Sequence, residues 1–170
     1  MMDNEEHFHE KKERVPSTWF HKLIEIITLF ILIIMIIYPF VMWNTLPSKI
    51  PAHYNALGEI DRWGTRSELF VLPIGGVFLY GLMSLVSLFP SAWNIPVTVT
   101  KENRKRVYQT AKSLLVLMKL EVIVIFGYLE YHSTQMKNLS GSFLGIVLVV
   151  VFGTVLYYIA RMYRVAKRRD

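Results

Sequence analysis

Four long apolar runs alternate with polar segments along the 170-residue chain. Within each run the apolar side chains are contiguous and follow neither the period of an amphipathic helix nor that of a strand. At 1.5 Å per helical residue, the runs cover about 27 to 32 Å, which matches a bilayer hydrocarbon core of about 30 Å. The pattern therefore predicts an all-α fold, an integral membrane four-helix bundle with spans at about 23–43, 69–89, 113–130 and 143–162.

Composition supports a membrane location and excludes thiol chemistry. Hydrophobic residues make up 53% of the chain, more than a soluble domain needs. No cysteine is present, so that neither a disulfide nor a thiolate metal site can form. Residues 1–18 begin with mostly charged or polar side chains, and we expect a cytoplasmic tail there, followed by a single four-span membrane domain over 19–170.

The distribution of Lys and Arg predicts the orientation of the spans. Fourteen of these residues lie before the first span, between the second and third, or after the fourth, whereas four lie in the other two connections. Because short cytoplasmic segments carry the excess of positive charge, we expect both termini in the cytoplasm and segment 44–68 outside. The basic inner surface can bind anionic lipid or dock a cytoplasmic regulator, but nucleic-acid binding is not expected beside a bilayer.

The outward segment 44–68 is predicted to be an ordered extracytoplasmic loop between the first two helices. Pro47 and Pro51 favour an extended entry, because a proline also pushes the preceding residue out of the helical region. Gly58 permits a turn. The loop is expected to end at a helix start, where Thr65 and Glu68 fit a capping box.

The same loop resembles a known family. It is similar to the signature of an uncharacterised bacterial membrane domain, best known as the N-terminal part of the immunity protein against the sporulation-delaying toxin of Gram-positive spore formers. The resemblance implies protection from a secreted toxic peptide and retention of a cognate repressor at the membrane. Full-length family members carry a second multi-span module, and a position that is often Lys in the family is Arg66 here. The matching residues are Leu46, Pro47, Ile50, Pro51, His53, Tyr54, Asn55, Gly58, Asp61, Arg62, Trp63, Gly64 and Arg66.

Side chains of the loop are candidates for recognition. His53 and Asp61 can bond to one another, which would orient the imidazole. The amphipathic rings of Tyr54 and Trp63 suit the lipid headgroup layer. The two arginines of the loop can bind lipid phosphate or another acidic group. The predicted recognition residues are Pro47, Pro51, His53, Tyr54, Asn55, Gly58, Asp61, Arg62, Trp63 and Arg66.

Neither a metal site nor an enzyme is expected. One His with neighbouring carboxylates offers fewer nitrogen ligands than most zinc centres use. Neither a His-Glu-x-x-His nor a Gly-x-Ser-x-Gly motif occurs in the chain. We therefore predict no metal, no cofactor and no catalytic residue, and a membrane hydrolase ranks third among the hypotheses.

Charged residues in and near the third span form a second group of candidates. Lys119 and Glu121 lie two positions apart, so that they point about 160° away from one another on a helix and cannot pair. Lys119 is expected to extend toward lipid phosphate, whereas Glu121 faces the bundle interior. Glu25 is a candidate neighbour of Glu121, and two such carboxylates would share a proton. Glu130 and His132 are expected at the outer surface, close to the loop.

Two functional hypotheses lead. The first is a membrane protein of immunity, sensing or accessory type that recognises a peptide, a lipid headgroup or a partner membrane protein through the loop. The second is a small transporter or ion-coupled carrier that uses Glu121 and Lys119.

Overall fold

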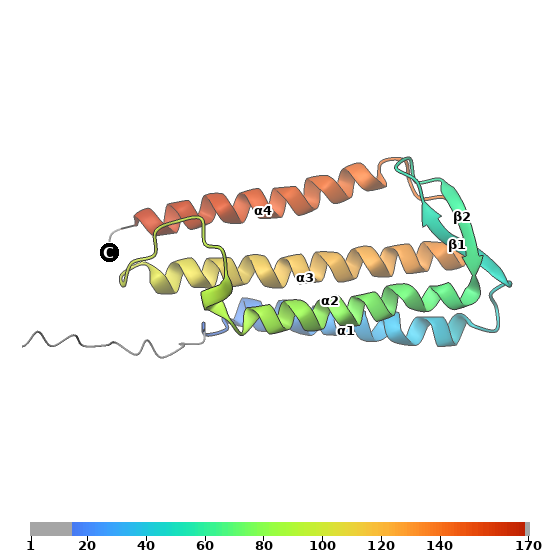
Figure 1. Cartoon of the computed structure of the whole chain (residues 1–170), viewed down its shortest axis with the longest axis horizontal. Coiled ribbons are helices and arrows are strands. Elements are labelled where there is room, and N and C mark those ends of the chain that lie inside the picture. The colour runs from blue at the N-terminus through green and yellow to red at the C-terminus, as the bar shows by residue number, and fades with distance from the viewer. Residues whose placement is uncertain (1–14, 169–170) are drawn as a thin grey trace, which may run out of the picture.

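The computed structural model describes residues 15–168, which form four long helices and a two-stranded hairpin (Figure 1). Most of the predicted charged tail lies outside the described residues. Short 3-10 helices flank the second long helix. The elements in chain order are α1 (Trp19–Met42), β1 (Lys49–Tyr54), β2 (Ile60–Thr65), η1 (Arg66–Phe70), α2 (Val71–Ser87), η2 (Pro90–Ala92), α3 (Arg104–Gln135) and α4 (Phe143–Lys167).

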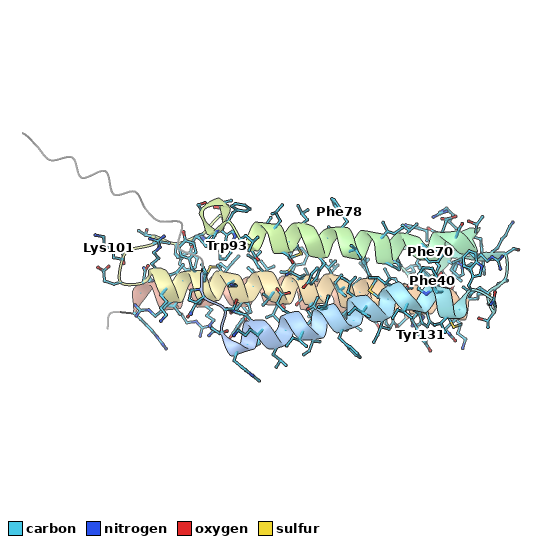
Figure 2. All side chains as sticks on the ribbon, turned by 90° about the horizontal axis from the view of Figure 1, so that it is seen from below. Phe40, Phe70, Phe78, Trp93, Lys101 and Tyr131 are labelled. Atoms are coloured by element: carbon cyan, nitrogen blue, oxygen red, sulfur yellow. The ribbon has the colours of Figure 1, made fainter. Side chains whose placement is uncertain are left out.

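The central helix of the bundle is α3. It packs extensively on α1, α2 and α4, whereas α1 and α2 touch each other less, and within residues 15–168 α4 packs substantially on no helix but α3. Figure 1 places α3 between α4 and the other two helices, and Figure 2 places it between α1 and α2. Each outer helix therefore packs mainly on α3, and α1 and α2 also contact each other.

The sequence of α1 explains this arrangement. Thr18 begins the helix, and its side chain accepts the backbone N–H of His21 at 3.3 Å. The buried residues recur at helical spacing on one face, while most of the large apolar side chains elsewhere on α1 are exposed. Such exposure suits lipid and not water. The buried residues of α1 are His21, Thr28, Leu32, Met35 and Pro39.

Three helices in the described part of the chain are long and apolar enough to cross a membrane: Trp19–Met42, Arg66–Ser87 and Phe143–Lys167. They correspond to three of the four predicted spans. The fourth, 113–130, lies within α3, which has 32 residues but is not among the candidate spans. The lower apolar content of α3 is explained by its central position. A helix covered by three others can carry charged side chains, because these find partners inside the bundle.

A β-hairpin departs from the predicted all-α fold. Between α1 and α2, strands β1 and β2 pair antiparallel, with Pro51 opposite Trp63 and His53 opposite Arg62. The register is irregular around His53. The chain is thus mostly helical, and the ordered loop expected between the first two helices contains a small sheet.

The two ends of the bundle differ. The hairpin covers one end, where α3 ends and α4 begins (Figure 1). At the other end α1 begins, α4 ends, and the connection between α2 and α3 folds back on itself. In Figure 2, Phe40, Phe70 and Tyr131 lie toward the hairpin end, and Trp93 and Lys101 toward the opposite end.

Close helix approach in the middle of the bundle depends on Gly76. A buried cluster of Leu32, Met35 and Ile123 joins α1 to α3, and Gly76 of α2 faces it. A Cβ at Gly76 would lie 3.3 Å from Leu32 and 3.4 Å from Ile123, whereas a Cβ at Gly81 would meet nothing within 4 Å. The absence of a side chain at Gly76 therefore permits close packing of α2 on α1 and α3, whereas exposed Gly81 makes no such contact.

We predict that Gly76→Ile destabilises the protein by about 1–3 kcal/mol, the usual effect of overpacking a filled core. Gly81→Ile, on the same helix with open space around it, is the matched control and should change the free energy of unfolding much less. Unfolding of both variants in detergent, followed by circular dichroism, measures the difference. Equal effects at the two positions would contradict the described packing.

Candidate functional site

The hairpin is anchored to the bundle by a small apolar core. Leu46, Ile50 and Leu69 are buried together, with Met42 of α1 packed against them. Ser133 of α3 donates a hydrogen bond to the carbonyl of Pro51 at 2.5 Å. Pro51, predicted as a recognition residue, is therefore part of the attachment of β1 to α3.

The turn of the hairpin is shaped by Asn55 and Gly58. The Asn55 side-chain oxygen accepts the backbone N–H groups of Leu57, at 2.9 Å, and Glu59, at 3.0 Å. Gly58 has φ +81°, which L side chains rarely adopt, and a Cβ there would lie 2.9 Å from the carbonyl oxygen of Leu139. Both residues of the predicted recognition set have a clear structural role.

The connection between α3 and α4 holds this turn in place. The Leu139 N–H donates to the Gly58 carbonyl at 2.8 Å, and the Ile60 N–H donates to the Asn138 side chain at 3.0 Å. Sequence reasoning missed both Asn138 and Leu139. Their signal is weak, because an Asn in a short polar connection is common and its partner lies 78 residues away.

An exposed pair of side chains confirms one predicted contact. His53 Nδ1 lies 2.6 Å from Asp61 Oδ1, with His53 63% and Asp61 41% exposed. The carboxylate orients the imidazole, as predicted from their types and spacing. Trp63 on β2 is also half exposed.

The two arginines of the loop have neighbours within the protein. Arg62 donates to Glu68 at 2.9 Å and to the Ala52 carbonyl at 3.2 Å. Glu68 also accepts the Thr65 backbone N–H at 3.1 Å, so that the predicted capping box forms at the start of η1. Arg66 lies over the Trp43 ring, 4.5 Å from its centroid. Arg62 thus binds an acidic group of the chain itself, one of the two alternatives expected, and the Arg66 guanidinium stacks on an aromatic ring.

Tyr54 also differs from its expected role. Its hydroxyl is buried and has no hydrogen-bond partner among the described residues. Burial raises the pKa of this phenol from 10.0 to about 12. Tyr54 therefore turns its hydroxyl inward instead of presenting it to the headgroup layer. The last of the predicted recognition residues, Pro47, is exposed and lies before β1.

Beneath the hairpin lies a hollow of about 510 Å³ between α2, α3 and α4. Its upper part carries polar side chains of the hairpin and η1, and its lower part carries apolar side chains of the helices. Such a combination is typical of sites that bind molecules with both polar and apolar parts. We call it the hairpin hollow; its lining includes His53, Tyr54, Asn55, Arg62, Glu68, Leu69, Leu72, Leu129, Ser133, Leu139 and Phe143.

Lys119 is buried in the bundle. Its side chain was expected to extend toward lipid phosphate, but it does not. Its ammonium lies 2.7 Å from Glu25 and 2.9 Å from the Ser84 hydroxyl. It also lies 4.6 Å from the centroid of the Tyr80 ring, whose hydroxyl donates to Glu25 at 3.1 Å. Because α1 and α2 both provide partners at this depth, pairing replaces the extension toward lipid.

Glu121 faces α4 and not Glu25. Thr154 of α4 donates to Glu121 Oε1 at 2.6 Å, while Oε2 is buried without a partner among residues 15–168. The two carboxylates that were expected to share a proton therefore have separate partners. Sequence reasoning missed Tyr80, Ser84 and Thr154, although hydroxyls inside apolar runs are a usable signal for such contacts.

Glu130, expected at the outer surface, is buried, and His132 packs on an aromatic ring. Glu130 is 1% exposed. It lies one helical turn from Thr134, whose hydroxyl bonds to Tyr38 of α1 at 2.8 Å, and the two residues share the face of α3 that packs on the bundle. The His132 ring packs on Tyr128 with centroids 4.3 Å apart. Among residues 15–168, no cluster of three or more His, Asp or Glu side chains could hold a metal ion.

Comparison with known proteins identifies a domain of unknown function and assigns no activity. Residues 30–77 match the family model of a domain of unknown function, DUF1648. This segment spans the second half of α1, the hairpin and the first part of α2. An uncharacterised protein from the archaeon Archaeoglobus fulgidus is 27% identical over 132 residues, which cover 68% of this chain and 72% of the relative. No solved structure matches.

The contacts of Lys119 lead to a prediction about stability. Glu25→Gln removes the countercharge of a buried ammonium, and we expect a loss of about 3–5 kcal/mol. In the double variant Glu25→Gln with Lys119→Met, no unpaired charge remains, so that most of this loss should be recovered. Denaturant titration of the detergent-solubilised protein measures both effects.

Glu121→Gln is the matched control for this prediction. It removes a carboxylate from the same region, but its amide oxygen can still accept the Thr154 hydroxyl, and we expect a change below about 1 kcal/mol. If the double variant is as unstable as Glu25→Gln alone, the pair does not act as described.

Proposed function

We propose that this chain is a multi-pass membrane protein of immunity, sensing or accessory type, which recognises a secreted peptide at the hairpin hollow on the outer side of the membrane. The observation that carries the proposal is the form of the hollow: a firmly anchored hairpin places polar side chains above an apolar floor made by three helices. An amphipathic peptide can bury apolar side chains against such a floor while its backbone and charges meet the polar rim.

The matched family segment supports this choice of site. The hairpin lies in the middle of residues 30–77, and the polar lining residues of the hollow that come from the hairpin and η1 belong to this segment. The resemblance to the immunity domain suggests a toxic peptide as the occupant. A lipid headgroup or a partner membrane protein are the other occupants that the test distinguishes.

A carrier function is the second candidate, and one observation favours it. Glu121 has a buried oxygen without a partner among the described residues and lines a mostly apolar hollow of about 360 Å³ between α3 and α4. A carboxylate in such a place can take up a proton or a cation. Lys119, by contrast, is held by Glu25, Ser84 and Tyr80, which supports a structural role for it.

The recognition proposal predicts that His53→Ala, in the lining of the hollow, and Trp63→Ala, an exposed ring on the paired strand outside that lining, weaken binding at least tenfold, about 1.4 kcal/mol, without loss of folding. The measurement is quantitative co-purification of bound peptide, lipid and protein from native membranes, scaled to the amount of purified chain. Lys137→Gln, an exposed charge beside the hairpin, is the matched surface control and should bind as the unchanged protein does.

Three outcomes separate the candidates. A peptide lost from both variants supports peptide recognition, whereas loss of a lipid or a protein from them identifies that occupant instead. If His53→Ala and Trp63→Ala retain every bound component, and reconstituted vesicles show ion flux that Glu121→Gln abolishes, the carrier hypothesis replaces recognition.

The proposed orientation places the hairpin outside and both termini in the cytoplasm. A single cysteine at Ser48, an exposed position before β1, should react with an impermeant thiol reagent in intact cells. A cysteine at Ser91, in the opposite end of the bundle, should react only after the cells are opened. The reverse pattern would overturn the orientation and with it an outer recognition site.

A further inference from the structure

A second hollow lies at the end of the bundle away from the hairpin. It has a volume of about 480 Å³ and is formed where α1 begins, α3 begins and α4 ends. Unlike the hairpin hollow, it is lined mainly by polar and positively charged side chains. We call it the basic pocket; it is lined by Thr18, Phe20, His21, Arg106, Gln109, Thr110, Ser113, Tyr158, Arg161 and Val165.

Two arginines line the basic pocket. Arg106 of α3 and Arg161 of α4 contribute guanidinium groups to its lining. The lining also contains uncharged hydrogen-bonding groups, which are the Gln109 amide and the hydroxyls of Thr18, Thr110, Ser113 and Tyr158. Arginine suits phosphate because its planar fork can donate two parallel hydrogen bonds to one anion.

The arginines are held in defined positions. Arg106 Nη2 donates to the backbone carbonyl of Arg168 at 2.9 Å, a bond that links α3 to the end of α4. The Arg161 guanidinium lies over the Tyr158 ring, 5.8 Å from its centroid. Such contacts reduce the conformational entropy that anion binding would otherwise cost.

His21 forms a wall of the pocket and need not carry charge. Its Nδ1 accepts the Thr18 backbone N–H at 3.2 Å, so that in this geometry the ring proton is on Nε2. Nε2 lies 2.8 Å from the Ser113 hydroxyl, which donates to the Gln109 carbonyl at 3.0 Å. The chain of bonds fixes α1 against α3, and the two arginines supply the positive charge.

The pocket lies where lipid headgroups can reach it. Within the described chain, α1 and α4 both pack on α3 and make little or no contact with each other. Trp19, at the start of α1, is 75% exposed, and an exposed Trp at the end of an apolar helix is typical of the headgroup layer. Basic pockets between membrane helices are known to bind the head groups of anionic lipids.

From this geometry we infer that the basic pocket binds a phosphate group through Arg106 and Arg161, with the headgroup of an anionic phospholipid as its source. Free inorganic phosphate has the same chemistry and is the other source. The inference does not depend on recognition at the hairpin, because the pocket lies at the opposite end of the bundle.

The test uses the full chain, delipidated in detergent and titrated with phosphatidylglycerol or phosphatidylcholine, with native mass spectrometry to count bound lipid. The unchanged protein should prefer phosphatidylglycerol. Arg161→Gln and Arg106→Gln should each lower this preference about fivefold, equivalent to about 1 kcal/mol for each basic residue. Arg164→Gln, an exposed arginine on α4 outside the pocket, is the matched control and should retain the preference.

A second arm identifies the source. Inorganic phosphate is compared with chloride at equal ionic strength, in neutral detergent, for its effect on the unfolding temperature. A rise with phosphate that both pocket variants lose indicates free phosphate, whereas selective lipid binding without such a rise indicates the phospholipid.

Folding effects are separated by Arg161→Lys, which keeps the charge without the planar fork and should show an intermediate preference. The inference is wrong if neither arm shows selective binding. It is also wrong if Arg164→Gln loses as much preference as the pocket variants, because binding would then follow general surface charge.

Discussion

Charged side chains on α3 must find partners where water is absent, and the arrangement of the bundle follows from this requirement. Lys119 is surrounded by Glu25 of α1 and by Ser84 and Tyr80 of α2, so that one ammonium brings three helices together. Glu121, on the opposite side, accepts a hydrogen bond from the Thr154 hydroxyl of α4. A helix with such polar positions is stable in a membrane only when neighbours cover it, which is why α3 is central and the three more apolar helices surround it.

The membrane helices can be predicted well from the sequence, because long continuous apolar runs are uncommon in water-soluble domains. The capping box at Thr65 and Glu68 could also be predicted, since it depends on local spacing. The contact between His53 and Asp61 was expected from the residue types, but it joins the two strands of a hairpin that the all-α prediction did not include. Partners far apart in the chain could not be predicted. Whether Lys119 extends to the surface or pairs with Glu25 depends on which helices pack together, and apolar runs do not encode that choice.

The β-hairpin shows why the loop was only partly predicted. Its prolines and glycines indicated order, but a proline within a short strand argues against regular pairing. Pro51 is tolerated because the register is irregular beside it and because its carbonyl bonds to Ser133 outside the sheet. Several residues that the resemblance places in a signature thus maintain the fold of the hairpin. Asn55 and Gly58 form its turn, whereas His53 and Trp63 are exposed.

The weak attachment of α4 connects the two candidate sites. Because α4 packs on α3 and on no other helix to a comparable extent in the described chain, space remains between it and α2 at one end and between it and α1 at the other. At the first end the hairpin covers the space, and its charges are already paired, as Arg62 with Glu68. At the second end Arg106 and Arg161 line the space. The same packing therefore produces one hollow suited to an amphipathic molecule and one suited to an anion, and the side chains at each end decide between them.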